Sequence, residues 1–199
     1  MTWRQWHDFL DAQRRLHGKT VFTATELANV AGCSLNVLRT TLNRLVKDAR
    51  MVRYAGGRYG LAEGVTIDAL LASLDSSAYV TGLYALQRHN LVTQVVGEIT
   101  CFTTRRHNRS RVRTTPLGRL VFVRVKSAIY SPPAEGVVAP PEQALCDFAY
   151  VTLRSGLLPQ SLVTLRRMAA LNRATLESVS QRYPLSVRRW LKEVAIGGQ

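Results

Sequence analysis

The sequence predicts an α+β protein with an N-terminal winged helix-turn-helix over residues 1–63. A mixed α/β C-terminal domain with a small sheet and several helices follows over residues 64–199. Three observations predict this organisation. Two short amphipathic helices flank a small-residue turn within residues 23–48, and a Gly-rich hairpin pattern follows at residues 51–61. Beyond residue 63, segments of helical period are interspersed with segments of strand period.

Residues 23–48 are expected to form two helices around a tight turn. Thr23 or Thr25 can cap the first helix, and Glu26 in its first turn complements the helix dipole. Gly32 is free to adopt the positive φ that a close turn needs. Ser34 is a suitable cap for the second helix. A helix over residues 2–17 is expected to precede this pair and to pack against it.

The second of these helices has two contrasting faces. Its apolar residues share one side, namely Leu35, Leu38, Leu42, Leu45 and Val46. Its polar residues share the other side, namely Asn36, Arg39, Thr40, Asn43, Arg44 and Lys47. This polar face has no acid before Asp48, whereas an ordinary solvated helix mixes both charges. Asn can pair with adenine edges and Arg with guanine edges, so the pattern favours a helix that reads DNA.

The N-terminal half of a recognition helix usually reaches the bases. The base-reading candidates are therefore Asn36, Arg39, Thr40 and Asn43. Cations further along the helix and on the hairpin are the phosphate-binding candidates, namely Arg44, Lys47, Arg53 and Arg58. The alternative is that some of these residues only cover the helix surface, with Arg44 or Lys47 paired locally with Asp48.

The composition favours polyanionic partners. The chain of 199 residues carries a formal net charge of +14, and each third of it is basic. Nucleic acid is the first candidate, with anionic membrane surfaces and acidic proteins as the others. Three widely spaced cysteines without a CxxC motif indicate a reducing cytoplasm. Because no signal peptide or membrane-spanning apolar run is visible, we expect a cytoplasmic protein without a membrane partner.

The second domain is expected to combine short strands with helices. Strands are predicted over residues 98–104, 119–125 and 137–139. Helices are predicted over residues 65–74, 81–90, 142–155, 159–171, 173–183 and 186–194. The domain boundary is placed near residue 63.

Two segments of the second domain, together with the winged helix, resemble the AbiEi family of bacterial antitoxins. Residues 79–91 read Tyr-Val-Thr-Gly-Leu-Tyr-Ala-Leu-Gln-Arg-His-Asn-Leu, and residues 139–147 read Ala-Pro-Pro-Glu-Gln-Ala-Leu-Cys-Asp. The three pieces span most of residues 20–155. The resemblance implies an antitoxin of a type IV toxin–antitoxin, or abortive-infection, system. Its N-terminal domain would bind promoter repeats and repress its own operon, and its C-terminal domain would counter a cognate nucleotidyltransferase toxin.

The partners expected from this reading are double-stranded promoter DNA and the toxin, and the resemblance does not require the two proteins to touch. A single winged helix reads a short site, so we expect a monomer in solution and several copies on adjacent repeats. One alternative is a ligand-responsive winged-helix transcriptional regulator without antitoxin activity. Another is an enzyme that acts on nucleic acid.

An arginine run lies between the first two predicted strands of the second domain. Its members are Arg105, Arg106, Arg109, Arg111 and Arg113, with no acid among them. The run could be a second contact for DNA or RNA, or a contact for an acidic surface of the toxin. The alternative is a solvated loop.

No catalytic, metal or cofactor site is expected. Glu142 and Asp147 lie five residues apart on one predicted helix and do not share a face. Glu142 fits first-turn electrostatics, and Asp147 fits a helix-surface or capping contact. The resemblance instead implies that Asp147 determines packing in the second domain. The four histidines are scattered without metal-ligand spacing, so we expect a protein that is not an enzyme.

Overall fold

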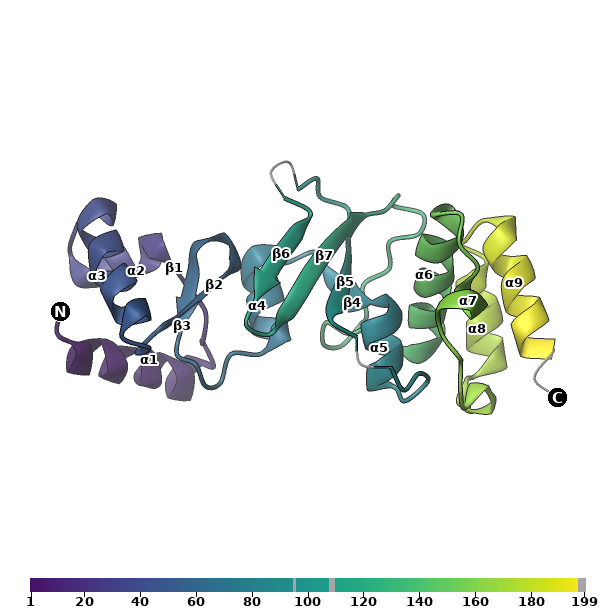
Figure 1. The fold of residues 1–199 in the computed structure, drawn as a ribbon, viewed down its shortest axis with the longest axis horizontal. Coiled ribbons are helices and arrows are strands. Elements are labelled where there is room, and N and C mark those ends of the chain that lie inside the picture. Colours follow the sequence, from purple (N-terminus) through teal and green to yellow (C-terminus); the bar gives the residue numbers. More distant parts are fainter. Residues whose placement is uncertain (95, 108–109, 197–199) are drawn as a thin grey trace. The chain divides into compact units, whose positions relative to one another are not determined.

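The computed structural model describes residues 1–94, 96–107 and 110–196 of the chain. It is a mixed α and β structure with two small sheets (Figure 1), which confirms the predicted α+β class. The chain divides into two compact units. The first contains Met1–Ser76 and Arg113–Leu117, and the second contains Ser77–Val112 and Gly118–Gln199. The first unit thus extends beyond the boundary expected near residue 63.

The first unit combines four helices with a three-stranded antiparallel sheet of order β1-β3-β2. Its elements are α1 (Trp3–His17), β1 (Phe22–Thr23), α2 (Ala24–Ala31), α3 (Leu35–Lys47), β2 (Val52–Tyr54), β3 (Arg58–Gly60) and α4 (Ile67–Leu74). The expected hairpin is formed by β2 and β3, with Ala55–Gly57 as its tip.

Local capping explains where α2 and α3 begin and end. Thr23, rather than Thr25, caps α2, and it forms a reciprocal capping box with Glu26. Gly32 ends α2 in the left-handed conformation, at φ 61°. Ser34 then caps α3 by accepting a hydrogen bond from the backbone amide of Val37. The two helices and their turn therefore follow from residues adjacent in sequence.

The core of the first unit lies beneath these helices. Its buried members include Trp6, Leu10, Phe22, Leu27, Leu38, Leu42, Leu45, Met51 and Tyr59. The expectation that Leu35 faces this core is wrong, since its side chain is 39% exposed. Leu35 is the first residue of α3, next to an exposed cap, so it lies at the end of the buried stripe.

The second unit is built around a sheet in which β4, β5 and β7 are neighbours in that order. In it β4 pairs antiparallel with β5, and β5 pairs parallel with β7. The elements are β4 (Tyr79–Thr81), α5 (Gly82–Arg88), β5 (Glu98–Thr103), β7 (Gly118–Arg124), α6 (Pro141–Arg154), α7 (Pro159–Leu162), α8 (Arg173–Ser180) and α9 (Leu185–Ile196). Of strand β6 (Val112–Thr115), only Val112 belongs to this unit. Nine of the 14 residues of α6 are buried, so α6 is the central helix of this unit.

Two expectations for the second unit are wrong. Residues 159–171 do not form one helix, because α7 ends at Leu162 and the backbone amide of Arg166 donates to the carbonyl of Leu91 (2.8 Å). Residues 137–139 form only an isolated parallel bridge, between Val80 and Val138. The structure also has a strand that was not predicted, β6 (Val112–Thr115), which includes Arg113 at the end of the arginine run.

Candidate nucleic-acid interface

The outer face of α3 is the strongest candidate for a binding surface. All six polar residues predicted to share this face are exposed, namely Asn36, Arg39, Thr40, Asn43, Arg44 and Lys47. On the opposite side, three leucines anchor the helix in the core at Leu38, Leu42 and Leu45. The predicted division of α3 into a core face and a polar face is therefore confirmed.

The cations on this face have no local counter-charge. The helix contains no acidic residue, and among the described residues no ion pair engages Arg39, Arg44 or Lys47. Asp48, which follows the helix, is likewise in no ion pair of the described part of the chain. Exposed cations without local partners are more consistent with a surface that binds an anionic ligand than with a surface that is only solvated.

Sequence reasoning missed one apolar residue on the same face. Val37, in the first turn of α3, is 59% exposed, although a β-branched apolar side chain usually gains stability from burial. An exposed methyl-bearing side chain beside polar base-reading candidates suits contact with the thymine methyl group in a major groove. The signal available in the sequence was that Val37 falls outside the stripe of buried leucines.

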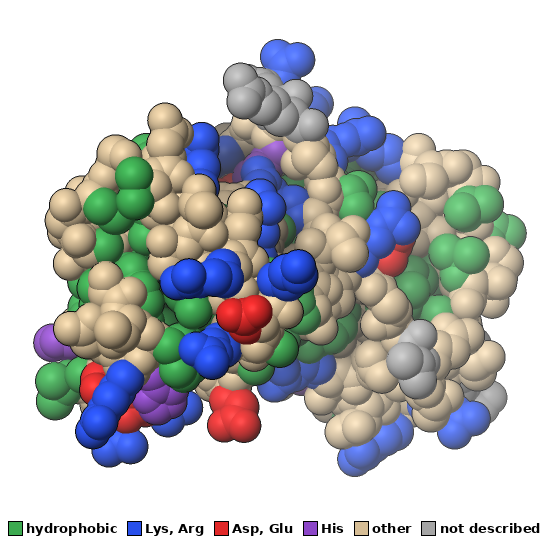
Figure 2. All heavy atoms as spheres, turned by 60° about the vertical axis from the view of Figure 1, so that its left-hand side comes forward, with side chains coloured by type: hydrophobic (Ala, Val, Ile, Leu, Met, Phe, Trp, Pro, Cys, Tyr) green, Lys and Arg blue, Asp and Glu red, His purple; other side chains and the backbone are tan. Residues whose placement is uncertain are grey.

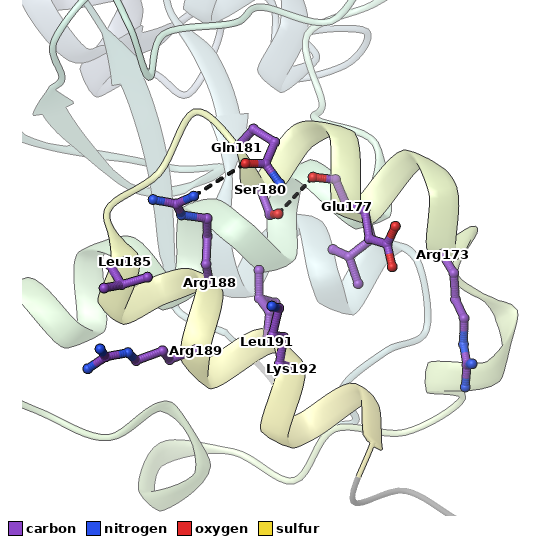
Figure 3. A pocket seen from close by; sticks show the side chains of 10 residues that line it. Arg173, Glu177, Ser180, Gln181, Leu185, Arg188, Arg189, Leu191 and Lys192 are labelled. Atoms are coloured by element: carbon purple, nitrogen blue, oxygen red, sulfur yellow. Dashed lines mark hydrogen bonds between the residues drawn. The ribbon is translucent and has the colours of Figure 1, made fainter.

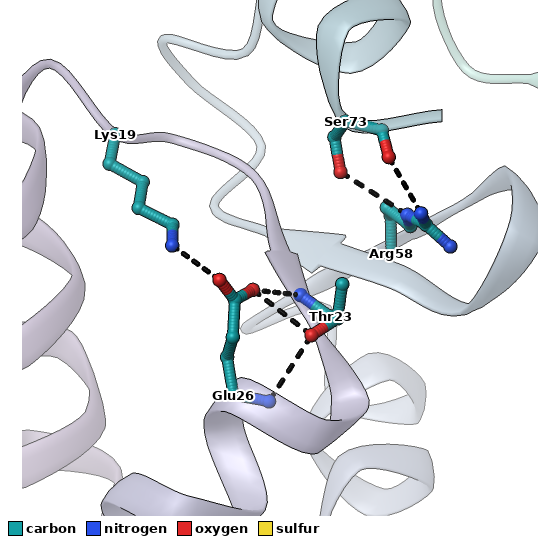
Figure 4. A network of polar contacts seen from close by, with 5 residues as sticks. All are labelled: Lys19, Thr23, Glu26, Arg58 and Ser73. Atoms are coloured by element: carbon teal, nitrogen blue, oxygen red, sulfur yellow. Dashed lines mark hydrogen bonds and ion pairs between the residues drawn. The ribbon is translucent and has the colours of Figure 1, made fainter. Parts of the chain in front are cut away.

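The two arginines of the hairpin differ in exposure and in hydrogen bonding. Arg53 on β2 is exposed, as a phosphate contact requires. Arg58 on β3 is half-buried, and its guanidinium donates to the Ser73 carbonyl (2.6 Å), the Ser73 hydroxyl (3.2 Å) and the Gly56 carbonyl (2.6 Å). Figure 4 shows Arg58 turned toward Ser73 on α4. These bonds hold α4 to the hairpin and favour a structural role for Arg58.

A second polar network fixes the start of α2 (Figure 4). The carboxylate of Glu26 accepts from the Lys19 ammonium (2.6 Å) and from the backbone amide of Thr23 (2.7 Å). Burial opposes ionisation of Glu26, but the hydrogen bonds from Lys19 and Thr23 outweigh it and lower the pKa of this carboxyl. The network positions α2 and, through the turn at Gly32, the start of α3.

The second unit gathers part of the arginine run around a cavity of about 480 Å³. Its charged lining consists of Arg105, Arg106, Arg111 and Arg124, and the ring of His107 stacks on Phe122 with 4.2 Å between centroids. Arg124 was not anticipated, because it lies on β7, far from the run in sequence. Arg113 does not line this cavity, and Arg109 lies outside the described residues.

The space-filling view shows how charged side chains are distributed on one face. On the face that Figure 2 shows, blue Lys and Arg side chains outnumber the red Asp and Glu side chains. This distribution agrees with the net charge of +14. A net charge of this sign and size attracts polyanions.

A buried carboxyl group joins three segments of the second unit. Asp147 on α6 is fully buried and accepts hydrogen bonds from the hydroxyls of Tyr183 (2.6 Å), Thr81 (2.7 Å) and Tyr79 (3.2 Å). Burial raises the pKa of Asp147 to about 7, although these hydroxyls lower it in part. The expectation of a helix-surface or capping contact for Asp147 is therefore wrong.

Glu142 is also largely buried, in the first turn of α6, and accepts a hydrogen bond from the backbone amide of Asn172 (2.8 Å). Both acids of α6 thus bind groups of the protein itself. Within the described residues, no group of three or more His, Cys, Asp and Glu side chains could hold a metal ion. No helix in the described ranges combines the length and apolar character needed to cross a membrane.

Comparison with protein-family models finds no match, and comparison with curated proteins finds none either.

Proposed function

We propose that the first unit contains a winged helix that binds double-stranded DNA, with α3 in the major groove and the β2–β3 hairpin as the wing. The observation that carries this proposal is the exposed polar face of α3, which contains no acid and is presented by a helix anchored through three buried leucines. In a helix-turn-helix, the second helix inserts its outward side chains into the groove. Asn36, Arg39, Thr40 and Asn43 would read bases, while Arg44, Lys47 and Arg53 would contact phosphates.

We further propose that the chain is an antitoxin of the AbiEi type that represses its own operon. The resemblance of residues 79–91 and 139–147 to that family supports this proposal. In this reading the second unit neutralises a cognate nucleotidyltransferase toxin, and the first unit binds repeats in the promoter.

DNA binding can be tested on the DNA directly upstream of the chain's own reading frame. We expect the full chain to protect a discrete segment in a footprint and to resist competition by unrelated DNA. The double variant Arg39→Ala/Asn43→Ala should lose this protection, because two base-reading side chains are removed. The matched control is Arg4→Ala, an exposed arginine on α1 that lies outside the proposed interface. Protection that survives the double variant would refute the role of α3.

Antitoxin activity can be separated from DNA binding in cells. The adjacent gene is expressed as the toxin, and growth is measured with the full chain supplied from an independent promoter. We expect rescue by the natural chain and by Arg39→Ala/Asn43→Ala alike, because neutralisation is assigned to the second unit. Absence of rescue by the natural chain would refute the antitoxin proposal and leave the DNA-binding proposal standing.

A further inference from the structure

A cavity of about 750 Å³ lies between α8 and α9 in the second unit (Figure 3). Leu176 and Leu191 line it with largely buried side chains, whereas Leu185, at the start of α9, is 52% exposed. The cavity therefore has an apolar floor and, at its edge, the exposed apolar side chain of Leu185. No residue of the described part of the chain buries this side chain fully.

The rim of this α8–α9 groove is strongly basic. Arg173 on α8 and three cations on α9, namely Arg188, Arg189 and Lys192, line it together with a single carboxylate, Glu177. Among the described residues none of these four cations is in an ion pair. The guanidinium of Arg188 makes one long hydrogen bond, to Gln181 (3.3 Å), and its buried Nε has no partner in the described ranges. Clustered cations around an apolar floor are stabilised when a ligand supplies the opposite charge.

We propose that the α8–α9 groove binds an acidic amphipathic helix of a partner protein. A helix laid in a groove between two helices buries apolar residues at i, i+3 or i+4, and i+7 against an apolar floor. The 12 residues of α9 extend about 18 Å, which is enough for such a set of anchors. Glutamates beside the anchors would then pair with the arginines and lysine of the rim.

Charge and lining chemistry disfavour the other occupants. A second copy of this chain would bring another net charge of +14 to a basic rim. Small-molecule pockets are mostly lined by hydrophobic and aromatic groups. The described lining of this groove contains no aromatic residue, and half of its residues are charged. Nucleic acid would satisfy the cations but would leave the exposed Leu185 without an apolar partner.

The test uses the full chain and a synthetic amphipathic peptide, with leucines at helical anchor spacing and glutamates elsewhere. A second peptide keeps the leucines and replaces every glutamate by lysine. We expect the glutamate peptide to bind and to shift the backbone amide resonances of α8 and α9. Arg189→Glu/Lys192→Glu should weaken binding by about tenfold or more, as expected for charge reversal at an interface.

The matched control is Arg154→Glu/Lys126→Glu, which makes the same change in net charge at two exposed residues outside the groove. It should bind the glutamate peptide with no more than a small loss. Equal binding of both peptides, an equal loss in the control variant, or no binding of the glutamate peptide would overturn the proposal. Displacement of that peptide by a single-stranded oligonucleotide that shifts the same amides would also overturn it. All of these outcomes are independent of the α3 footprint, so the two proposals can fail separately.

Discussion

Arg39 and Lys47 occupy different positions along α3, and this difference assigns them different tasks. Arg39 is in the N-terminal half of the helix, whereas Lys47 is its last residue. The N-terminal half of a recognition helix reaches base edges, and cations beyond it contact phosphates. Although both side chains are exposed cations, we therefore expect their removal to change DNA binding in different ways.

Arg39→Ala should cost about 1–3 kcal/mol of binding on the preferred site and relax the choice of base at one position. Lys47→Ala should weaken binding to all DNA sequences similarly and reduce the slope of log affinity against log salt by about 1. The measurement is fluorescence anisotropy with the preferred site and with single-base variants, over a series of salt concentrations. Equal effects of the two substitutions on preferred and altered sites would contradict this assignment.

Arg58 and Arg53 offer a second pair, on the two strands of the hairpin. Because Arg58 is bonded to Ser73 and Gly56, Arg58→Ala should lower the free energy of unfolding by about 1–2 kcal/mol. Arg53→Ala, at an exposed position, should leave stability nearly unchanged and reduce the salt dependence of DNA binding. Urea unfolding and salt titration of both variants provide the comparison. A stable Arg58→Ala variant with reduced salt dependence would return Arg58 to the phosphate-binding set.

At the scale of the element, the start of α2 depends on a reciprocal cap between two side chains, Thr23 and Glu26. The Thr23 hydroxyl accepts from the backbone amide of Glu26 (3.1 Å), and the Glu26 carboxylate accepts from the backbone amide of Thr23 (2.7 Å). Thr23→Ala removes half of this reciprocal cap and should lower the free energy of unfolding by about 1 kcal/mol. Thr25→Ala is the matched control, because Thr25 lies within α2 and does not cap it. Denaturant unfolding distinguishes the two, and equal losses would contradict the capping argument.

In α3, the residues that stabilise the fold and the residues proposed to bind DNA lie on opposite sides of the helix. Its leucines stabilise the fold through burial in the core. Its outer face carries positive charge, and the helix contains no acidic residue to balance that charge. Replacing outward cations should therefore change affinity with little change in stability, since exposed side chains outside specific contacts contribute little to folding.

At the scale of the whole molecule, Asp147 makes stability depend on pH. Its three hydroxyl partners come from β4 and from the segment between α8 and α9, so its charge state acts on the packing of the second unit. The pKa of Asp147 rises from 3.8 to about 7 in the folded chain, so the folded state binds the proton more tightly than the unfolded state. Stability from this group is therefore complete below about pH 4 and is lost as the pH rises through about 7.

The contribution of Asp147 to the pH dependence of stability can be measured by comparing the natural chain with Asp147→Asn. The pKa shift corresponds to roughly 4 kcal/mol of unfolding free energy lost between about pH 4 and about pH 7. Asp147→Asn has no titrating group at this position, so it should lack this loss, although other acids titrate in both proteins. Urea unfolding of the natural chain and the variant across that range isolates the contribution of Asp147. Parallel pH profiles would contradict this prediction, because they would show that the pKa of Asp147 is the same in the folded and unfolded chains.

Much of the fold was predictable from neighbouring residues. The caps at Thr23 and Ser34, the turn at Gly32, and strands β5 and β7 all follow from local patterns, as does the polar face of α3. Capping and periodic alternation are properties of residues within a few positions of one another. The sequence alone was therefore sufficient to indicate the candidate DNA-binding surface.

Other features were decided only by the tertiary structure. Arg124 joins the arginine run at a cavity because β7 pairs with β5, and the guanidinium of Arg58 is bonded to Ser73 on α4. Asp147 is buried because hydroxyl donors up to 68 residues away in sequence converge on it. Burial of a polar group depends on partners that only the folded chain brings within hydrogen-bond distance, so no local pattern of residues could have revealed these contacts.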